Sequence, residues 1–534
     1  MTYRRAAWAV VLLAAALRFW GLGNGLPHPL TRPDEEVLLH HLVGPARGDF
    51  DLRYAVYPSL YFYVMWAWCA LVLRAGALAG LVTPQPLAVV LADRPEHVLL
   101  VARALSALVG TLTVAVMLRL TRTTMGRGAA LLAGALLATN LLHVRDAHAA
   151  KPDALLTLGV AVALLVMARV AAGATVAGVL ACGAAIGLAT GIKYPALLLL
   201  APAWVAVAAG SDRRGWRRWL DVRLAAVGGA AALAFVATSP YLLLNPETRR
   251  AVLGVFGSIF PSLFPSLVPA ALPPALFEMT PERAWWSGFA YHVGVSLRYG
   301  IGWLPLLLAV PALVWGWRSP RPMARVAVAW IAVYFVVHGL SPMLLSRYMT
   351  PLLPALFLLE AGLAAAVLAR ATRWRALAAT AATLALVGPP LVQSLAYDRV
   401  MARTDTRVLA TEWLAAHAEP GTRVLVAGTV FWGYGEPLMP PGVEKLRPEP
   451  GMTALPPGVR FVVGHDHPTF ASRFDPAALG ALGDRLRLVL DLDPFVGPRD
   501  AARFEEFDAY YVPLAGFSAV ERTGPRIRIY AVAG

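Results

Sequence analysis

Long apolar runs separated by short basic connections make up most of the first 393 residues. A helix needs about 20 apolar residues to cross a bilayer, and most of these runs come close to that length. The pattern therefore predicts an all-α polytopic membrane domain over residues 1–393. The candidate spans are residues 6–23, 57–80, 98–118, 129–142, 154–172, 176–191, 195–209, 224–240, 301–317, 324–340, 350–369 and 376–393.

Arginine positions indicate how these runs cross the membrane, because short cytoplasmic loops carry an excess of Lys and Arg. If residues 57–80 crossed fully, the later basic connections would lie outside. If they do not cross, those connections lie in the cytoplasm with Arg4 and Arg5. We therefore predict about eleven spans, with 57–80 as an aromatic-rich juxtamembrane or re-entrant helix inside a first external loop, 24–97.

The start of the chain fits either a signal peptide or a first span, since Arg4 and Arg5 precede an apolar run. The run continues to Trp20 without a clean small-residue cleavage pattern, which favours an uncleaved anchor with its N-terminus in the cytoplasm. A later external segment, 241–300, contains FPSLFPSLVPAALPP. Its prolines exclude one regular helix, so we expect a lid or packing loop there.

Residues 394–534 differ in character, being rich in Pro, Asp and Arg with short apolar strands such as RVLVAG, RFVVGH and RIRIYAV. The stretch WLAAHAEPGTRVLVAG is typical of a helix, a Pro-Gly turn and a buried strand. This pattern predicts a small extracytoplasmic α/β domain over residues 394–534.

Composition agrees with a membrane protein and excludes several functions. Hydrophobic residues are 58% of the chain and charged residues 15%, with a mean hydropathy of +0.60. The net charge of +15 is spread between apolar runs, which disfavours nucleic-acid binding. Cys69 and Cys182 lie inside apolar runs, and His465 and His467 are expected in a solvated turn. The sequence has no Walker A loop, dinucleotide fingerprint or HExxH motif.

Ionisable residues at the predicted external helix ends are costly to keep there, so each is a candidate for function. The first cluster, RPDEE, places Arg32, Asp34, Glu35 and Glu36 directly after the first span. The plain alternative is an acidic helix start, capped by Asp34 and favoured by the helix dipole.

The second cluster, HVRDAHAAKPDALL, compresses Arg145, Asp146, His148, Lys151 and Asp153 into a connection of about ten residues. Pro followed by Asp is also an ordinary way to begin a helix. The number of functional side chains between two spans favours a site.

The third and fourth clusters are GIKYP, with Lys193 and Tyr194, and LSRYMTPLLP, with Arg347 and Tyr348. Such pairs are also common as snorkelling residues in an aromatic belt. Both pairs fall on the external side, where the topology rule predicts few bases. Fixed cations there suit an anionic headgroup, because Arg can hold phosphate oxygens through paired hydrogen bonds.

The order of these motifs resembles that of the GT-C membrane glycosyltransferases, in particular the protein O-mannosyltransferase and aminoarabinose-transferase-like group. The similar segments are RPDEE, YPSLYFYV, AHAAKPDALLTL, GLATGIKYPALLLLAPAW and SRYMTPLLPALFLL, which together cover about residues 1–400. The resemblance implies an inverting transfer of a sugar from a polyprenyl-phosphate donor to an external acceptor. One departure concerns the donor: Tyr57 and Pro58 stand where the aminoarabinose transferases have Lys-Pro.

The resemblance also implies roles for individual residues. Asp34 would be the base, supported by Glu35, and Asp153 would position a substrate or share a divalent metal with Asp34. The metal itself stays open. The residues implied in binding the donor phosphate are Lys193, Arg347, Tyr348 and Arg145. Those implied in positioning acceptor or donor are Arg32, His148, Lys151, Tyr57 and Tyr194.

The sequence thus predicts an inner-membrane glycosyltransferase whose partners are the lipid bilayer, a polyprenyl-phosphate sugar and a glycan, lipid or protein acceptor. A transporter or flippase of lipid-linked intermediates is the alternative. Transporters usually hold charges near the midplane on broken helices and often show inverted repeats. Here the charges cluster at external helix ends and no repeat is evident, which favours an enzyme. A catalytically silent scaffold is a third interpretation.

Overall fold

The computed structural model describes residues 2–259, 286–341, 343–370, 374–428, 433–449, 452, 454–469, 472–474, 485–505, 508 and 510–533. The Pro-rich stretch FPSLFPSLVPAALPP lies outside the described residues. The chain divides into two compact units. The first comprises Met1–Phe19, Leu38–Leu91 and Val101–Val392, and the second comprises Trp20–Val37, Ala92–Leu100 and Gln393–Gly534.

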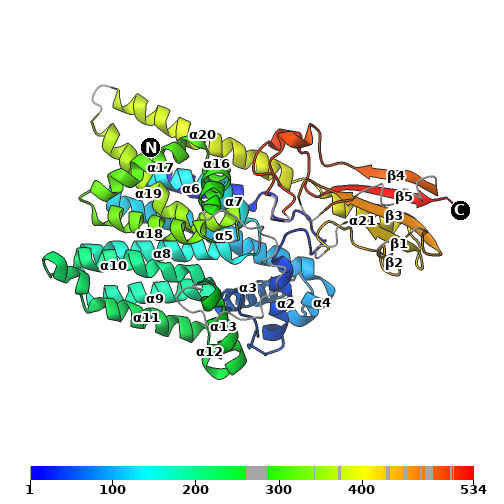
Figure 1. Cartoon of the computed structure of the whole chain (residues 1–534), viewed down its shortest axis with the longest axis horizontal. Coiled ribbons are helices and arrows are strands. Elements are labelled where there is room, and N and C mark those ends of the chain that lie inside the picture. Colours follow the sequence, from blue (N-terminus) through cyan, green and yellow to red (C-terminus); the bar gives the residue numbers. More distant parts are fainter. Residues whose placement is uncertain are drawn as a thin grey trace. The chain divides into compact units, whose positions relative to one another are not determined.

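The first unit is built from long apolar helices, many of which run side by side (Figure 1). Its helices are α1 (Tyr3–Phe19), α3 (Ser59–Leu78), α6 (Arg127–Thr139), α7 (Leu141–Ala147), α8 (Pro152–Ala172), α9 (Val176–Ile192), α10 (Leu200–Gly210), α11 (Arg223–Thr238), α12 (Tyr241–Leu244), α13 (Pro246–Ile259), α15 (Ser287–Tyr291), α16 (Arg298–Ile301), α17 (Trp303–Arg318), α18 (Pro322–Gly339) and α19 (Leu353–Leu368). It also holds the larger parts of α2 (Glu35–Ala46), α4 (Leu87–Asp93), α5 (Pro95–Met125) and α20 (Arg375–Met401). Tighter turns cover η1 (Tyr194–Leu199), η2 (Gly215–Leu220) and η5 (Ser346–Leu352), and a π-helical turn covers η4 (His292–Leu297).

In the described residues, seven helical segments are long and apolar enough to cross a membrane, or up to nine if each of two bent pairs forms one span. The bent pairs are α6 with α7, at 57°, and Ser287–Ile301 with α17, at 117°. These helices confirm a polytopic, mostly helical membrane protein. The count of eleven stays a prediction, as does the juxtamembrane interpretation of residues 57–80, because α3 also has the length and composition of a span.

Helices α9 and α11 pack closely because small residues recur every fourth position along α9. A Cβ added to Gly187 would lie 2.2 Å from the carbonyl oxygen of Ala231, and one added to Gly183 would lie 2.4 Å from that of Val227. Such spacing lets two helix backbones approach without side chains between them. Helix α9 therefore has a fixed place in the bundle, and Lys193 follows directly as its C-cap.

The second unit contains a five-stranded sheet in the order β2-β1-β3-β5-β4. The strands are β1 (Arg423–Ala427), β2 (Glu444–Leu446), β3 (Val459–Asp466), β4 (Leu486–Leu492) and β5 (Arg526–Val532), with α21 (Thr406–His417) before them and short turns at η7 (Arg499–Ala501) and η8 (Phe517–Ala519). Strand β1 pairs in parallel with β2 and β3, whereas β5 is antiparallel to β3 and β4.

Alternation along the strands gives the sheet two apolar faces. One face packs Val424 and Val426 against Leu414 of α21, and the other gathers Leu425 and Val462. Helix α21 therefore covers one side of the sheet, and the predicted succession of helix, turn and buried strand is confirmed. The small C-terminal α/β fold is confirmed with it.

The prediction of a solvated turn for the two histidines is wrong. His465 and His467 are both buried. The His465 ring bonds to Ser472 Oγ at 2.8 Å, and Ser472 bonds in turn to the Tyr511 hydroxyl at 2.8 Å. Burial lowers the pKa of His465 to about 4. The pattern His-Asp-His was misleading because β3 extends to Asp466 and places His465 in the core.

Candidate functional site

A buried ion pair lies where α8 begins and α9 ends. Asp153, in the first turn of α8, places Oδ1 2.7 Å from Nζ of Lys193, with side-chain exposures of 2% and 11%. The Lys193 ammonium also lies 4.9 Å from the ring centroid of Tyr348 and 5.8 Å from that of Tyr57. Two aromatic faces and one carboxylate thus hold the cation in place. Pro152 and Asp153 do begin a helix, as the plain alternative expected, and that helix start presents Asp153 to Lys193.

Further cations surround this pair. Arg347 and Lys151 are buried and interact electrostatically with Asp153, while Arg145 interacts with its neighbour Asp146. Charges are seldom buried unless they are paired or serve a ligand. Together with Lys193, this cluster holds four cations against two carboxylates. Because its cations outnumber its carboxylates, the cluster suits a phosphate group.

One member of this cluster was missed by sequence reasoning. The Thr350 hydroxyl donates a hydrogen bond to Oδ2 of Asp146. Thr350 lies three residues after Arg347 in η5, and residues at this spacing share one side of a 3₁₀ helix. That spacing was visible in SRYMT and would have identified Thr350. Tyr348 also contacts the ring of His338, which stacks on Tyr334.

Two other predicted residues of the first unit, Tyr194 and His148, hydrogen-bond to backbone carbonyls near the cluster. The Tyr194 hydroxyl donates to the carbonyl of Ala55 at 2.8 Å, and the Tyr61 hydroxyl donates to that of Ala150 at 2.6 Å. These bonds tie the segment that carries Tyr57 to the α7–α8 connection and to η1. His148 is buried and bonds through Nδ1 to the carbonyl of Val144 at 2.8 Å, within its own helical turn.

The acidic motif belongs to the second unit. Asp34 has a φ of 70°, in the left-handed region that few residues other than glycine adopt. Helix α2 starts at the next residue and carries Glu35 and Glu36 in its first turn, so the acidic helix start that was the plain alternative is present. Arg32 is buried and reaches the carbonyl of Leu22 at 3.5 Å. Backbone strain of this kind is concentrated at functional sites.

A tyrosine that lies between β1 and β2 in the sequence hydrogen-bonds to the acidic motif. The Tyr434 hydroxyl donates to Oε1 of Glu36, and the backbone of Asp34 hydrogen-bonds to the same phenol. Burial and the nearby Glu36 carboxylate raise the pKa of Tyr434 well above its usual value, so this hydroxyl stays protonated. Tyr434 therefore links the strained backbone of Asp34 to the side chain of Glu36.

An arginine holds Tyr434 and the N-terminal segment of the second unit together. Arg407 donates from Nη1 to the carbonyl of Tyr434 at 2.6 Å and from Nη2 to that of Thr31 at 3.3 Å. Its partner Asp405 lies 2.7 Å away, and the two side chains are 1% and 0% exposed. Burial opposes ionisation of Asp405, but Arg407 outweighs it and lowers the pKa to about 2. Sequence reasoning missed Tyr434, Arg407 and Asp405.

The possible metal ligands are Asp34 and Asp153, one in each unit. In the described part of the chain, no group of three or more His, Cys, Asp or Glu side chains gathers as metal ligands do. One oxygen of Asp153 is already bonded to Lys193. Sugar transfer measured with and without a chelator therefore tests whether the reaction depends on a metal.

Comparison with known proteins agrees with the motifs. A family model described as dolichyl-phosphate-mannose-protein mannosyltransferase matches residues 95–243, which include Asp153 and Lys193. No curated protein matches the sequence.

The fold is similar to solved membrane proteins. An oligosaccharyltransferase from Archaeoglobus fulgidus, in complex with Zn and sulfate, is 12% identical over 88% of this chain and 72% of that one, with a TM-score of 0.51. ArnT from Cupriavidus metallidurans, bound to undecaprenyl phosphate, is 17% identical over 100% of this chain and 98% of that one, with a TM-score of 0.47. The family match and the oligosaccharyltransferase fold confirm the resemblance to the GT-C superfamily.

Proposed function

We propose that this GT-C glycosyltransferase moves a sugar from a polyprenyl-phosphate donor to an extracytoplasmic acceptor, with inversion at the anomeric carbon. The observation that carries the proposal is the buried cluster around the Asp153–Lys193 pair, at 2.7 Å. Its cations lie at the ends of apolar helices. A lipid-linked donor needs this combination of a polar pocket for its phosphate beside apolar surface for its isoprenoid.

The reaction is a single displacement. Asp34 accepts the proton of the acceptor hydroxyl, whose oxygen forms a bond to the anomeric carbon from the face opposite the phosphate. The bond from that carbon to the phosphate oxygen breaks, and its electron pair leaves with the polyprenyl phosphate. The departing group thereby gains charge. Lys193 and Arg347 stabilise that charge as it forms, which is where fixed cations lower a barrier most.

The carboxylates of the cluster have a different role from Asp34. Asp153 orients the Lys193 ammonium, and Tyr348 and Tyr57 restrict it further. Asp146 is held by Thr350 and balances Arg145. A cation already fixed before the donor binds needs little reorganisation during the reaction.

The chain is proposed to lie in the inner membrane, with its N-terminus in the cytoplasm and residues 394–534 outside. The arginine-rich connections support this orientation. Asp34 and the cationic cluster then both belong to the extracytoplasmic side, with Glu35 supporting the base. Arg32, His148 and Tyr194 maintain the segments that carry these groups, and Lys151 belongs to the cationic cluster itself.

The test uses the full chain in lipid nanodiscs with a panel of radiolabelled polyprenyl-phosphate sugars and candidate acceptors. We expect transfer from one donor, and we expect Lys193→Gln to reduce it at least about 100-fold, because the leaving group loses a fixed cation. Arg213→Gln, in an exposed connection, is the matched control and should retain transfer. Loss of transfer with chelator would show a metal requirement. Movement of lipid-linked sugar without transfer would favour the flippase alternative.

A further inference from the structure

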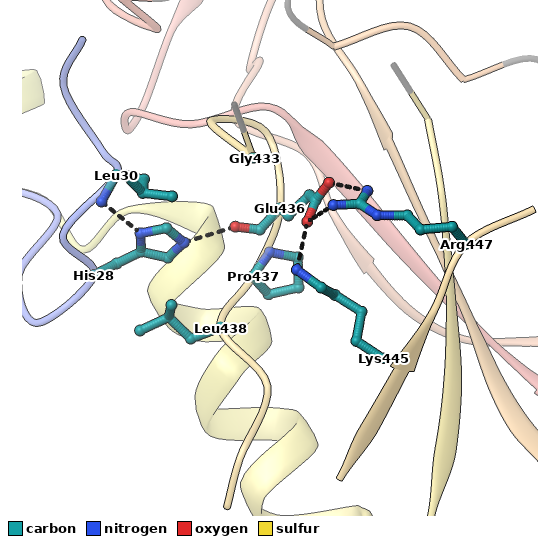
Figure 2. A pocket seen from close by; sticks show the side chains of 8 residues that line it. All are labelled: His28, Leu30, Gly433, Glu436, Pro437, Leu438, Lys445 and Arg447. Atoms are coloured by element: carbon teal, nitrogen blue, oxygen red, sulfur yellow. Dashed lines mark hydrogen bonds and ion pairs between the residues drawn. The ribbon is translucent and has the colours of Figure 1, made fainter. Parts of the chain in front are cut away.

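A small pocket of about 210 Å³ lies within the second unit, beside the turn that carries Tyr434. Figure 2 shows that an N-terminal segment and the sheet domain both contribute to it. Its lining residues are His28, Leu30, Gly433, Glu436, Pro437, Leu438, Lys445 and Arg447.

A carboxylate and two cations form the polar side of the pocket. Glu436 accepts hydrogen bonds from both terminal nitrogens of Arg447, at 2.9 Å from Nη2, and from Nζ of Lys445 at 3.2 Å (Figure 2). Burial opposes ionisation of Glu436, but the two cations outweigh it and hold its pKa below the usual value. Glu436 is therefore ionised at neutral pH.

The histidine adds no charge. His28 bonds through Nε2 to the carbonyl of Glu436 at 2.7 Å, and its Nδ1 accepts from the backbone N–H of Leu30 at 3.1 Å. These partners fix the tautomer with its proton on Nε2. Burial, aided by Arg407, lowers the pKa of His28 to about 4. The pocket thus carries one net positive charge from its two cations and one carboxylate.

The two cations have more N–H donors than their hydrogen bonds to Glu436 use. The Lys445 ammonium has three protons and the Arg447 guanidinium five, more than Glu436 can accept. Their side chains are 42% and 33% exposed, whereas Glu436 is 4% exposed, so the cations are accessible while the carboxylate lies behind them. Leu30, Pro437 and Leu438 supply apolar walls.

We propose that this pocket binds one anionic sugar unit of the acceptor, a phosphosugar or an acidic sugar. The proposal rests on the proposed glycosyltransferase function. The volume is below the roughly 300 Å³ at which drug-sized ligand sites begin, which suits a single charged unit. An acidic peptide would be expected to pair with the backbone of edge strand β2, whereas the donors of this pocket are side chains.

The position of the pocket connects binding to the reaction. The turn Gly433–Glu436 lines the pocket and also carries Tyr434, which hydrogen-bonds to Glu36 and to the backbone of Asp34. An acceptor unit held here is therefore bound by the same turn that positions the proposed base. This arrangement would select acceptors by charge.

The experiment is isothermal titration of the full chain in nanodiscs with glucose 6-phosphate, glucose, inorganic phosphate and an acidic peptide. We expect glucose 6-phosphate to bind most tightly, and its affinity to fall as salt is raised. Lys445→Gln should weaken it about 10-fold, the size of one charge-assisted hydrogen bond. The control is Arg487→Gln, an exposed residue of β4 at the opposite edge of the sheet. Tighter binding of the peptide, or equal binding of glucose, would overturn the proposal.

A second variant gives a change of opposite sign. Glu436→Gln removes the competing carboxylate and leaves both cations, so glucose 6-phosphate should bind about 10-fold more tightly. A purely structural role for Glu436 predicts loss of binding instead. Thermal unfolding of each variant shows that its fold is retained.

The two proposals fail separately. Asp34→Asn should abolish sugar transfer and leave glucose 6-phosphate binding unchanged, because Asp34 does not line the pocket. Transfer that survives Lys445→Gln, with no binding of the probe to the parent chain, would overturn the pocket alone. Probe binding without transfer from any donor would overturn the glycosyltransferase function alone.

Discussion

Tyr434→Phe is the most informative single change, because it removes one hydroxyl without altering the volume of the side chain. That hydroxyl hydrogen-bonds to the Glu36 carboxylate and to the backbone of Asp34. A hydrogen bond to a charged group contributes about 1.5–3 kcal/mol. If this energy serves to hold Asp34 in its strained, reactive position, its loss lowers kcat about 10- to 100-fold.

The assay is steady-state sugar transfer by the full chain in nanodiscs, with kcat and KM for the donor measured separately. We expect kcat to fall and the donor KM to stay constant, because no member of the cationic cluster changes. In a Glu36→Gln background, Tyr434→Phe should cost little more, since the interaction is already weakened. Tyr530→Phe, elsewhere in the same sheet, is the matched control.

Two results would refute this reasoning. One is an equal loss of kcat from Tyr434→Phe in both backgrounds, which would show that Tyr434 does not act through Glu36. The other is a rise in donor KM at constant kcat, which would place Tyr434 in donor binding.

Three further predictions concern stability, each measured by chemical or thermal unfolding in nanodiscs. Arg407→Ala should destabilise the second unit by about 3–5 kcal/mol, because it leaves Asp405 buried without its partner. Changing both Arg407 and Asp405 to Ala should cost less stability than the sum of the two single changes. Strict additivity of the two changes would contradict this prediction. Burial keeps His28 neutral, with a pKa of about 4 against an ordinary 6.5. Below pH 6.5 the unfolded chain therefore binds the proton first, and the free energy of unfolding falls by up to about 3 kcal/mol by pH 4. His28→Gln should flatten the dependence of stability on pH, and an unchanged dependence would contradict the prediction. Gly187→Val should lower the unfolding temperature by several degrees because its side chain would meet the Ala231 carbonyl, whereas Gly228→Val, which meets no neighbouring atom, is the control.

The membrane helices and the cationic cluster were largely predictable because their signals are local. Apolar length predicts a span, and a base at an external helix end is costly enough to indicate function. Lys193 and Tyr348 were singled out on that argument, and the structure brings Lys193 to Asp153 and Tyr348 to Lys193. The contacts between them were not predictable, because they depend on how separate helices pack.

The support of the acidic motif could not be predicted for a related reason. Arg407 and Tyr434 lie in the C-terminal part of the chain, yet they contact Thr31 and Glu36 near its start. Neither forms part of a periodic pattern or a short motif. Buried polar contacts over such sequence separation follow from the tertiary fold and leave little trace in one sequence.

The most direct test of the central claim is sugar transfer from the polyprenyl-phosphate panel by Asp34→Asn, compared with the parent chain and with chelator present or absent. The amide keeps the size of the carboxylate but cannot accept the acceptor's proton. We predict that transfer is lost while binding of the lipid-linked donor is retained. Transfer by Asp34→Asn at the parent rate would contradict the assignment of Asp34 as the base. Absence of transfer by the parent chain from every donor would contradict the glycosyltransferase function.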